Sequence, residues 1–191
     1  MNEKQNTFQE SCKNDKVLRR LLVDELKRDK IIHVVDVGDD KVFMPADIDL
    51  LIVNKDYRIN SVEAKADNYG ATAGVKKIFI ETISNDKKFA ISGGSEGMGN
   101  ARYSKSDYFL YYFIKLQSYL IIPTIQLQAW ITVNLPKGKY EIKTAKTCGI
   151  DGRVLYNSYG MLVPINVLID EAGAKLFDAQ YKWEDYVDPA V

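Results

Sequence analysis

Two short apolar runs joined by a polar turn constrain the fold of this chain more than any other stretch. The first run covers residues 45–53, a polar turn follows at residues 54–56, and the second run covers residues 61–67. Such a pair predicts two antiparallel strands in a hairpin. Alternation along the second run places its polar side chains on one face, Ser61, Glu63, Lys65 and Asp67, and its apolar side chains on the other, Val62, Ala64 and Ala66.

The polar face of this hairpin is expected to gather two carboxylates and an ammonium group. Asp49 opens the first strand, so antiparallel pairing brings its carboxylate beside Glu63, and Lys65 follows on the same face. Mg²⁺ and Mn²⁺ take oxygen ligands, and Mg²⁺ usually takes one or two carboxylates with water and substrate phosphate oxygens. We therefore predict that Asp49 and Glu63 hold the metal, while Lys65 positions water or neutralises charge on the phosphate. This arrangement suits hydrolysis of a phosphodiester bond by a metal-activated water.

Asp49, followed after a gap of thirteen residues by Glu63-Ala64-Lys65, resembles the motif of the PD-(D/E)XK, or restriction-endonuclease-like, nuclease superfamily. The resemblance covers residues 8–135 and implies a mixed central sheet flanked by helices. It also implies that Asp49 and Glu63 bind the metal, that Lys65 is the catalytic lysine and that DNA is the substrate. Three downstream stretches are similar to the phage and mobile-element branch of these nucleases: residues 79–82, 104–108 and 109–113.

The match departs from the family pattern at the first acid. In the family this acid commonly follows a proline directly, whereas Ala46 separates Pro45 from Asp47, and Asp49 is further away. Asp47 therefore competes with Asp49 for the role of metal ligand, and Asp49 is preferred because it borders the apolar strand. Some members of the family add an acid from the first helix, for which the candidates here are Glu10, Asp15 and Glu25.

Other functions remain open beside metal-dependent DNA cleavage. A Glu-x-Lys pair on a polar strand face is also typical of a solvated ion pair. The chain could be a catalytically inactive nuclease-fold protein that binds DNA or takes part in an assembly. It could also be an interaction protein, such as an inhibitor or a toxin partner, in which the face with Glu63 and Lys65 is an ordinary sheet surface. Metal binding separates the first function from the others, and DNA binding without cleavage selects the second.

Charge and residue usage narrow these functions further. The 26 basic and 26 acidic residues give a net charge of zero, whereas nucleic-acid binders usually carry a basic excess. Any DNA-binding surface is therefore expected to be a local patch.

His33 is the only histidine and lies in an apolar run, which predicts a core or strand residue and weakens the case for histidine-based catalysis. Cys12 and Cys148 have no metal-ligand spacing and predict neither a zinc site nor a disulfide.

The rest of the chain predicts a single α/β domain over residues 1–191, with its core at residues 8–135. An elaboration over residues 136–191 is expected to contain a C-terminal β-hairpin extension at residues 140–160. Helices are predicted at residues 7–30, at residues 124–133 with Thr124 as cap, and at residues 163–174 with Pro164 in the first turn. Further strands are predicted at residues 31–35 and 75–84, and a hairpin at residues 108–122.

Two further features bear on the site and its surroundings. Glu81 interrupts an apolar strand, so it is expected to pair with a lysine or to lie near the metal. The glycine-rich residues 92–100 lack the ending of a phosphate-binding loop and predict a surface loop, which in a nuclease could order over DNA.

The sequence shows neither a signal peptide nor a membrane-spanning run, which predicts a cytoplasmic protein with no membrane partner. Whether a homodimer is needed to cut two strands stays open.

Overall fold

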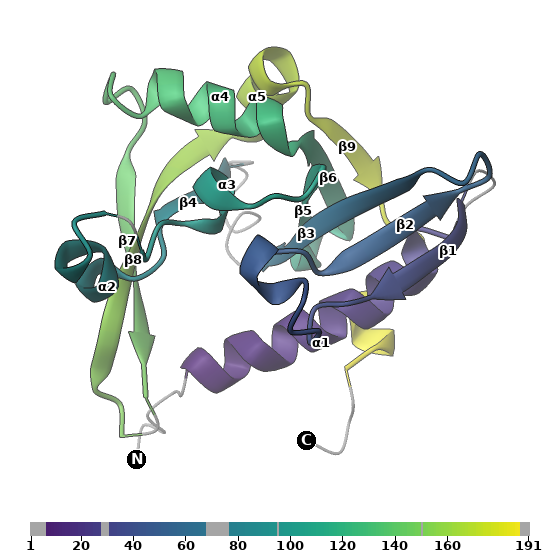
Figure 1. Cartoon of the computed structure of the whole chain (residues 1–191), viewed down its shortest axis with the longest axis horizontal. Coiled ribbons are helices and arrows are strands. Elements are labelled where there is room, and N and C mark those ends of the chain that lie inside the picture. The colour runs from purple at the N-terminus through teal and green to yellow at the C-terminus, as the bar shows by residue number, and fades with distance from the viewer. Residues whose placement is uncertain (1–6, 28–30, 68–76, 95, 150, 188–191) are drawn as a thin grey trace.

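The computed structural model describes residues 7–27, 31–67, 77–94, 96–149 and 151–187 (Figure 1). The protein is a mixed α/β structure built on a six-stranded sheet with the strand order β1-β2-β3-β5-β6-β9. Neighbouring strands are antiparallel except β3 and β5, which run parallel. The strands are β1 (Ile31–Asp36), β2 (Leu50–Asn54), β3 (Ile59–Asp67), β5 (Tyr108–Phe113), β6 (Ser118–Pro123) and β9 (Lys175–Asp178).

A smaller antiparallel sheet contains three strands in the order β4-β8-β7. They are β4 (Lys77–Ile83), β7 (Ile142–Cys148) and β8 (Val154–Pro164). The predicted C-terminal hairpin is β7 with β8, and β8 also pairs with β4 along its other edge. The hairpin is therefore joined to the strand that carries Glu81. Residues 75 and 76 of the predicted strand lie outside the described residues.

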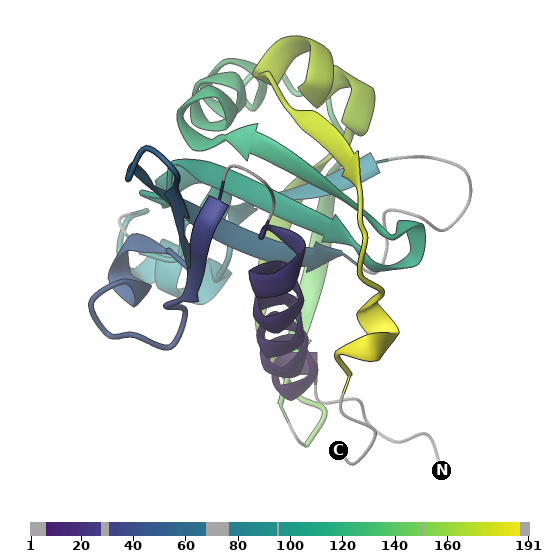
Figure 2. The ribbon, with the colours of Figure 1, turned by 90° about the vertical axis from the view of Figure 1, so that its right-hand side faces the viewer.

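Helices cover both faces of the large sheet. Figure 2 shows α1 on one side of this sheet and both α4 and α5 on the other. None of the described helices is both long enough and apolar enough to cross a membrane. The described residues form α1 (Thr7–Glu25), α2 (Asp86–Ile91), α3 (Asn100–Tyr103), α4 (Thr124–Asn134) and α5 (Ile165–Ala172), with the short 3-10 turns η1 (Met44–Ala46), η2 (Ile114–Leu116) and η3 (Trp183–Asp185).

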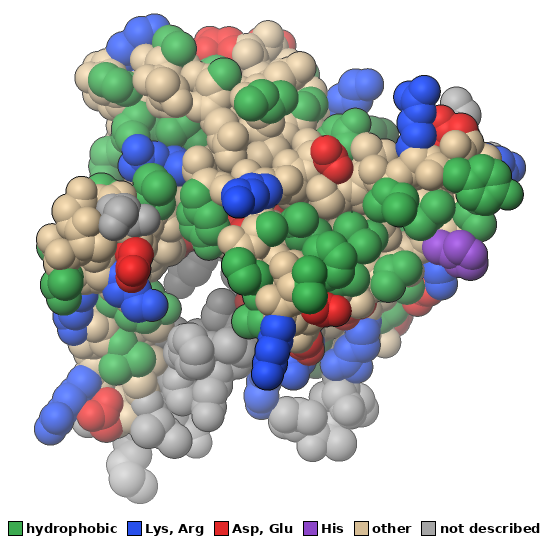
Figure 3. All heavy atoms as spheres, viewed as in Figure 1, with side chains coloured by type: hydrophobic (Ala, Val, Ile, Leu, Met, Phe, Trp, Pro, Cys, Tyr) green, Lys and Arg blue, Asp and Glu red, His purple; other side chains and the backbone are tan. Residues whose placement is uncertain are grey.

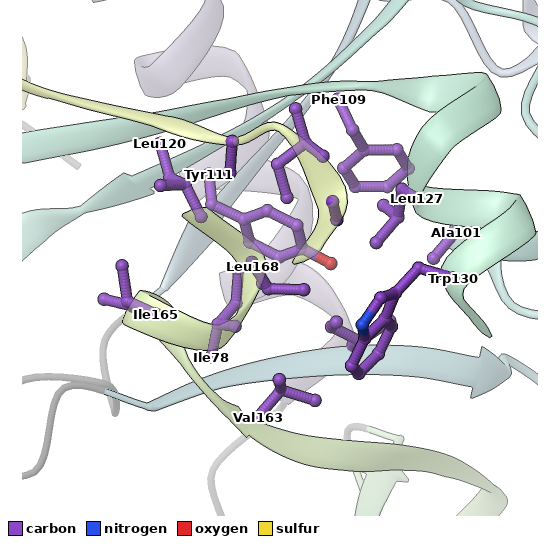
Figure 4. Packing of buried hydrophobic residues seen from close by; sticks show 14 of the residues in the cluster. Ile78, Ala101, Phe109, Tyr111, Leu120, Leu127, Trp130, Val163, Ile165 and Leu168 are labelled. Carbon is purple, nitrogen blue, oxygen red and sulfur yellow. The ribbon is translucent and has the colours of Figure 1, made fainter. Parts of the chain in front are cut away.

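Strand β5 separates two hydrophobic cores. Phe109 and Tyr111 point into a core shared with α4, α5 and the small sheet, which Figure 4 shows from close by. Leu110 and Tyr112 point the other way, into a core shared with α1. A strand covered on both faces has no polar side to alternate with the apolar one. This arrangement explains why residues 109–113 form an unbroken apolar run.

Helix boundaries differ from the prediction in three places. The helix predicted for residues 7–30 ends at Glu25, because the chain must reverse direction before β1 begins at Ile31; residues 28–30 lie outside the described residues. The helix predicted from residue 163 begins at Ile165, because residues 163 and 164 complete β8 in its pairing with β4. It ends before Gly173, whose φ of 65° favours glycine.

The structure also bears on two predicted residue roles. Thr124 does not cap α4, since the cap position is Pro123 and the Thr124 hydroxyl lies 3.1 Å from the Ser106 hydroxyl. His33 is a strand residue, as predicted, but it is exposed on β1, where the pairing with β2 shifts register. The Cys12 side chain lies outside the described part of the chain, so the predicted lack of a disulfide stays a prediction.

Candidate active site

The hairpin of β2 and β3 brings Asp49 and Glu63 together. Leu50 pairs with Val62, and the same register places Asp49 opposite Glu63. The Asp49 backbone N–H donates to the Val62 carbonyl at 2.9 Å. Its side-chain Oδ2 accepts from the Ala64 backbone N–H, also at 2.9 Å. The backbone of β3 therefore holds the Asp49 carboxylate at the mouth of the hairpin.

The predicted alternation along β3 is confirmed for the side chains that the structure describes. Val62 and Ala64 are buried in the core shared with α1. Glu63 and Lys65 lie on the opposite face, where Lys65 Nζ is 2.6 Å from Glu63 Oε1. The Asp67 side chain lies outside the described part of the chain. The lysine and the two predicted acids are thus gathered on one face, as the sequence indicated.

Burial and neighbouring charges together set the protonation of Glu63 and Lys65. The Glu63 side chain is only 2% exposed, and this burial raises its pKa well above the ordinary value, although Lys65 opposes the shift. Burial lowers the pKa of Lys65, but the charges of Glu63, Asp47 and Asp15 more than offset it, so this pKa is well above its ordinary value. Lys65 is therefore an ammonium ion at neutral pH, suited to stabilising negative charge and unsuited to accepting a proton.

Asp47 joins the site alongside Asp49. It follows η1 with φ 56° and ψ 57°, in the left-handed region. Its Oδ1 accepts from Asn100 Nδ2 at 3.0 Å, while its Oδ2 is buried with no hydrogen-bond partner among the described residues. Burial raises the pKa of Asp47 to about 6, with Lys65 opposing the shift and Asp49 adding to it. The two aspartates that competed for one role therefore both belong to the site.

Two further polar residues belong to the site, Asn100 and Tyr103, and the sequence did not mark either as a site residue. Asn100 Nδ2 donates to Glu63 Oε1 at 2.9 Å as well as to Asp47, so one amide group bridges two carboxylates. The Tyr103 hydroxyl lies 3.5 Å from Asp47 Oδ1. Burial raises the pKa of Tyr103 to about 12, and Asp47 and Glu63 add to the shift. The phenol therefore keeps its proton at neutral pH.

Residues 99–105, which we call the clamp segment, are anchored to both sides of the site. The Gly99 backbone N–H donates to the Thr82 carbonyl of β4 at 3.0 Å. A Cβ at Gly99 would collide with the carbonyl oxygen of Glu81, so only glycine allows this approach. Ser104 Oγ donates to the Asp47 carbonyl at 3.0 Å. The end of the glycine-rich stretch, predicted as a surface loop, is thus a structural part of the site, and Gly99 was its one signal in the sequence.

Of the three helix acids proposed from the sequence, the structure places Asp15 at the site. Burial raises the pKa of Asp15, Lys65 lowers it, and Asp49 raises it again. Glu25 is buried elsewhere, where its Oε2 accepts from the Gln180 backbone N–H at 2.7 Å. The Glu10 side chain lies outside the described part of the chain. A single helix acid therefore faces Lys65 among the described side chains.

Arg19 links α1 to the loop that precedes β2. It is 6% exposed, and its guanidinium lies 2.8 Å from Asp36 Oδ1 and 2.9 Å from Asp39 Oδ1. Its Nη1 also lies 4.0 Å from Asp49 Oδ1. A Cβ at Gly38 would lie 2.7 Å from Arg19 Cδ, so the glycine leaves room for this side chain. Arg19 thereby places a second cation beside the site.

Glu81 approaches the site from the small sheet. Burial raises the pKa of Glu81; the charge of Lys65 lowers it, while that of Asp47 raises it. Of the two alternatives predicted for Glu81, an ion pair with a lysine is not found among the described residues, and the charges of Lys65 and Asp47 act on Glu81 from the candidate site. The site contains five carboxyl groups and two cations, which are Asp15, Asp47, Asp49, Glu63 and Glu81 with Arg19 and Lys65.

No protein-family model, curated protein or solved structure matches this chain. What the site can do therefore follows from its own residues. Within the described ranges, no three His, Cys, Asp or Glu side chains form a ready-made metal cluster. Mg²⁺ needs only one or two carboxylates, together with water and substrate oxygens. The buried and partnerless Asp47 Oδ2, in a site with excess negative charge, fits such a cation.

Proposed function

We propose that this protein is a metal-dependent DNA endonuclease of the PD-(D/E)XK superfamily, which hydrolyses phosphodiester bonds. The observation that supports it most is the buried Glu63 in contact with the half-buried Lys65, beside Asp49 and Asp47 at the mouth of one hairpin. A mixed sheet flanked by helices, with Asp49 directly before its second strand and Glu63 on its third, also supports a restriction-endonuclease-like fold. A catalytically inactive DNA-binding protein with the same fold is the second candidate, favoured by the lack of a ready-made metal cluster among the described residues.

Asp49 and Glu63 would hold Mg²⁺ or Mn²⁺, and Asp47 offers a third carboxylate. Their arrangement suits this role because each acid is held by a hydrogen bond: Asp49 accepts from the Ala64 N–H, and Asp47 and Glu63 share the Asn100 amide as donor. When bound, the cation supplies Lewis-acid activation of a water molecule and neutralises charge on the phosphate. Its charge would also relieve the repulsion among the three carboxylates.

The remaining polar residues act on the phosphate and on the acids. Lys65 stays protonated, so it can stabilise the negative charge that develops on the phosphate oxygens. Its contact with Glu63 fixes the direction of the ammonium group. Asn100 holds Asp47 and Glu63 at a fixed separation. These groups are set by the fold before substrate arrives, which lowers the cost of organising the site during the reaction.

The test is a cleavage assay on plasmid, linear and branched DNA with Mg²⁺, Mn²⁺ or EDTA. We expect cleavage that needs the metal and falls at least about 100-fold in Glu63→Gln and in Lys65→Ala, a loss of the size found when one transition-state contact is removed. Glu141→Gln is the matched control, since Glu141 also contacts a lysine two residues later but is exposed. Metal-dependent cleavage that survives Glu63→Gln would refute the proposed site. Well-folded protein that binds DNA and cuts none would select the inactive DNA-binding protein instead.

A further inference from the structure

The turn that leads into the site carries apolar side chains that the described protein leaves exposed. Val42 is 77% exposed and Met44 is 57% exposed. Figure 3 shows a hydrophobic patch over this part of the molecule, in front of η1 and β2. The turn itself is held firmly, because Asp40 accepts hydrogen bonds from the backbone N–H groups of Val42 at 2.8 Å and Met44 at 3.0 Å. The two apolar side chains are therefore presented to solvent at a defined position just before Asp47.

The clamp segment adds an aromatic ring to the same region. The Tyr103 hydroxyl lies 3.5 Å from Asp47 Oδ1, while the residue is 38% exposed, so its ring connects the site to the surface. Two residues later, the Lys105 backbone N–H donates to the Ala46 carbonyl at 2.9 Å. This bond holds the clamp segment against η1, and Figure 1 shows α3 and η1 close together.

Cations flank these apolar groups. Lys41, Arg102 and Lys105 are exposed and form no ion pair with another described residue. The acids of the same turn are already engaged: Asp39 contacts Arg19, and Asp40 accepts the backbone N–H groups of the turn. The rim of the site therefore combines exposed apolar and aromatic side chains with available positive charge.

This combination of side chains is typical of surfaces that bind single-stranded nucleic acids. Proteins that bind single strands place cations along the backbone and stack bases on aromatic side chains. A regular duplex keeps its base faces stacked inside and offers mainly phosphates to a surface. Tight binding of an intact duplex relies on many phosphate contacts, and this chain has no net positive charge to supply them. An apolar rim next to the site therefore favours unpaired bases.

We propose that the rim formed by Lys41, Val42, Met44, Arg102, Tyr103 and Lys105 binds unpaired nucleotides of single-stranded DNA beside the scissile phosphate. This inference rests on the proposed nuclease function and names its substrate. The preferred DNA has unpaired bases at the cut, as in a single strand, a flap or a branch, and a continuous duplex is a poor substrate.

The test measures DNA binding in EDTA, so that affinity is read without cleavage. A labelled single strand and a duplex of the same sequence are titrated with wild-type protein and with the double variant Val42→Ser, Met44→Ser. We expect the single strand to bind at least about 10-fold more tightly than the duplex, and the double variant to lose about 10-fold of that affinity. Ile59→Ser is the matched control: Ile59 is 62% exposed, but it is the first residue of β3 and pairs with Val53 near the turn of the hairpin, so its loss should leave both DNA affinities unchanged.

Three outcomes would overturn the inference. One is equal affinity for the two DNA forms, and another is a double variant that binds the single strand like wild type. The third is a wild-type dimer that the double variant converts to monomers with unchanged DNA affinity, which would assign the patch to a second copy of the chain. Preferential single-strand binding without any metal-dependent cleavage would support the rim and refute the nuclease. Metal-dependent cleavage of duplex and single strand at equal rates, with equal binding of both, would support the nuclease and refute the rim.

Discussion

The protein contains two Glu-x-Lys pairs with the same geometry and different surroundings. Lys65 Nζ lies 2.6 Å from Glu63 Oε1 on β3, and Lys143 Nζ lies 2.6 Å from Glu141 Oε1 at the start of β7. The Glu63 side chain is 2% exposed, whereas that of Glu141 is 57% exposed. Their pKa values move in opposite directions: burial raises the pKa of Glu63, and the hydrogen bond with Lys143 lowers the pKa of Glu141.

The comparison shows that spacing does not distinguish a site from a surface ion pair. Glu141 and Lys143 are the solvated pair that the sequence also allowed for Glu63 and Lys65. Around Glu63 the fold adds Asp47 and Asp49 and excludes water, so the charges there interact strongly. Water screens the charges of the exposed pair, Glu141 and Lys143. A Glu-x-Lys pattern becomes a candidate site only where tertiary structure buries it beside further acids.

The largest difference between the pairs should appear when each lysine is removed. We expect Lys65→Ala to lower the free energy of unfolding by about 2–3 kcal/mol near neutral pH, below the range for a fully buried pair because Lys65 is 34% exposed. Lys143→Ala should leave it unchanged. The pKa of Lys65 is raised above 10.5, so its stabilisation is present below pH 10.5 and lost only at higher pH. Urea denaturation of both variants measures this, and equal losses would remove the distinction.

The amide that bridges the buried acids should matter nearly as much. Asn100→Ala removes the donor shared by Asp47 and Glu63, and we expect metal-dependent activity or metal affinity to fall 10- to 100-fold, as for other residues that orient ligands. The control is Asn54→Ala, since Asn54 Nδ2 bonds Asn60 Oδ1 at 2.8 Å at the far end of the same hairpin. Cleavage rates at several Mg²⁺ concentrations test this. Equal activity of the two variants would mean that Asn100 has only a structural role.

The pH dependence of stability should reveal the buried charge directly. Burial raises the pKa of Asp47 from 3.8 to about 6. Between these values the unfolded chain has released the proton and the folded protein still holds it, so stability falls as the pH rises. In EDTA, Asp47→Asn should gain about 1–3 kcal/mol relative to wild type between pH 4 and pH 6, at about 1.4 kcal/mol per pKa unit. Chemical denaturation across this range measures the gain, and parallel pH profiles would contradict the assignment.

The smallest effect is expected from salt. Exposed ion pairs are screened by added salt and buried ones much less. The lowered pKa of Glu141 should return towards its ordinary value of 4.5 in high salt, while the raised pKa of Glu63 should stay where it is. Titration of the side-chain carboxyl signals by NMR at low and high salt follows both residues in one sample. A Glu63 signal that follows salt like that of Glu141 would show that water reaches the buried pair.

The sequence by itself determined the mixed α/β class, the hairpin of β2 and β3, and the meeting of Asp49, Glu63 and Lys65 on one face of it. Register in a short hairpin follows from its turn and from alternation along the strand, both of which are local. The same local logic predicted the hairpin of β5 with β6 and that of β7 with β8. Cap and boundary predictions at α4 and α5 were wrong because tertiary pairing of neighbouring strands set those ends.

Only the tertiary structure decided which other groups join the hairpin. Asp47, Asp15, Asn100 and Glu81 come from a turn, a helix, the clamp segment and the second sheet, and no periodicity in the sequence relates these segments. Long-range bonds hold them in place, such as that from Gly99 to Thr82 and that from Ser104 to Asp47. Burial is likewise a property of the whole fold. It is the reason that Glu63 and Glu141, identical in local pattern, carry oppositely shifted pKa values.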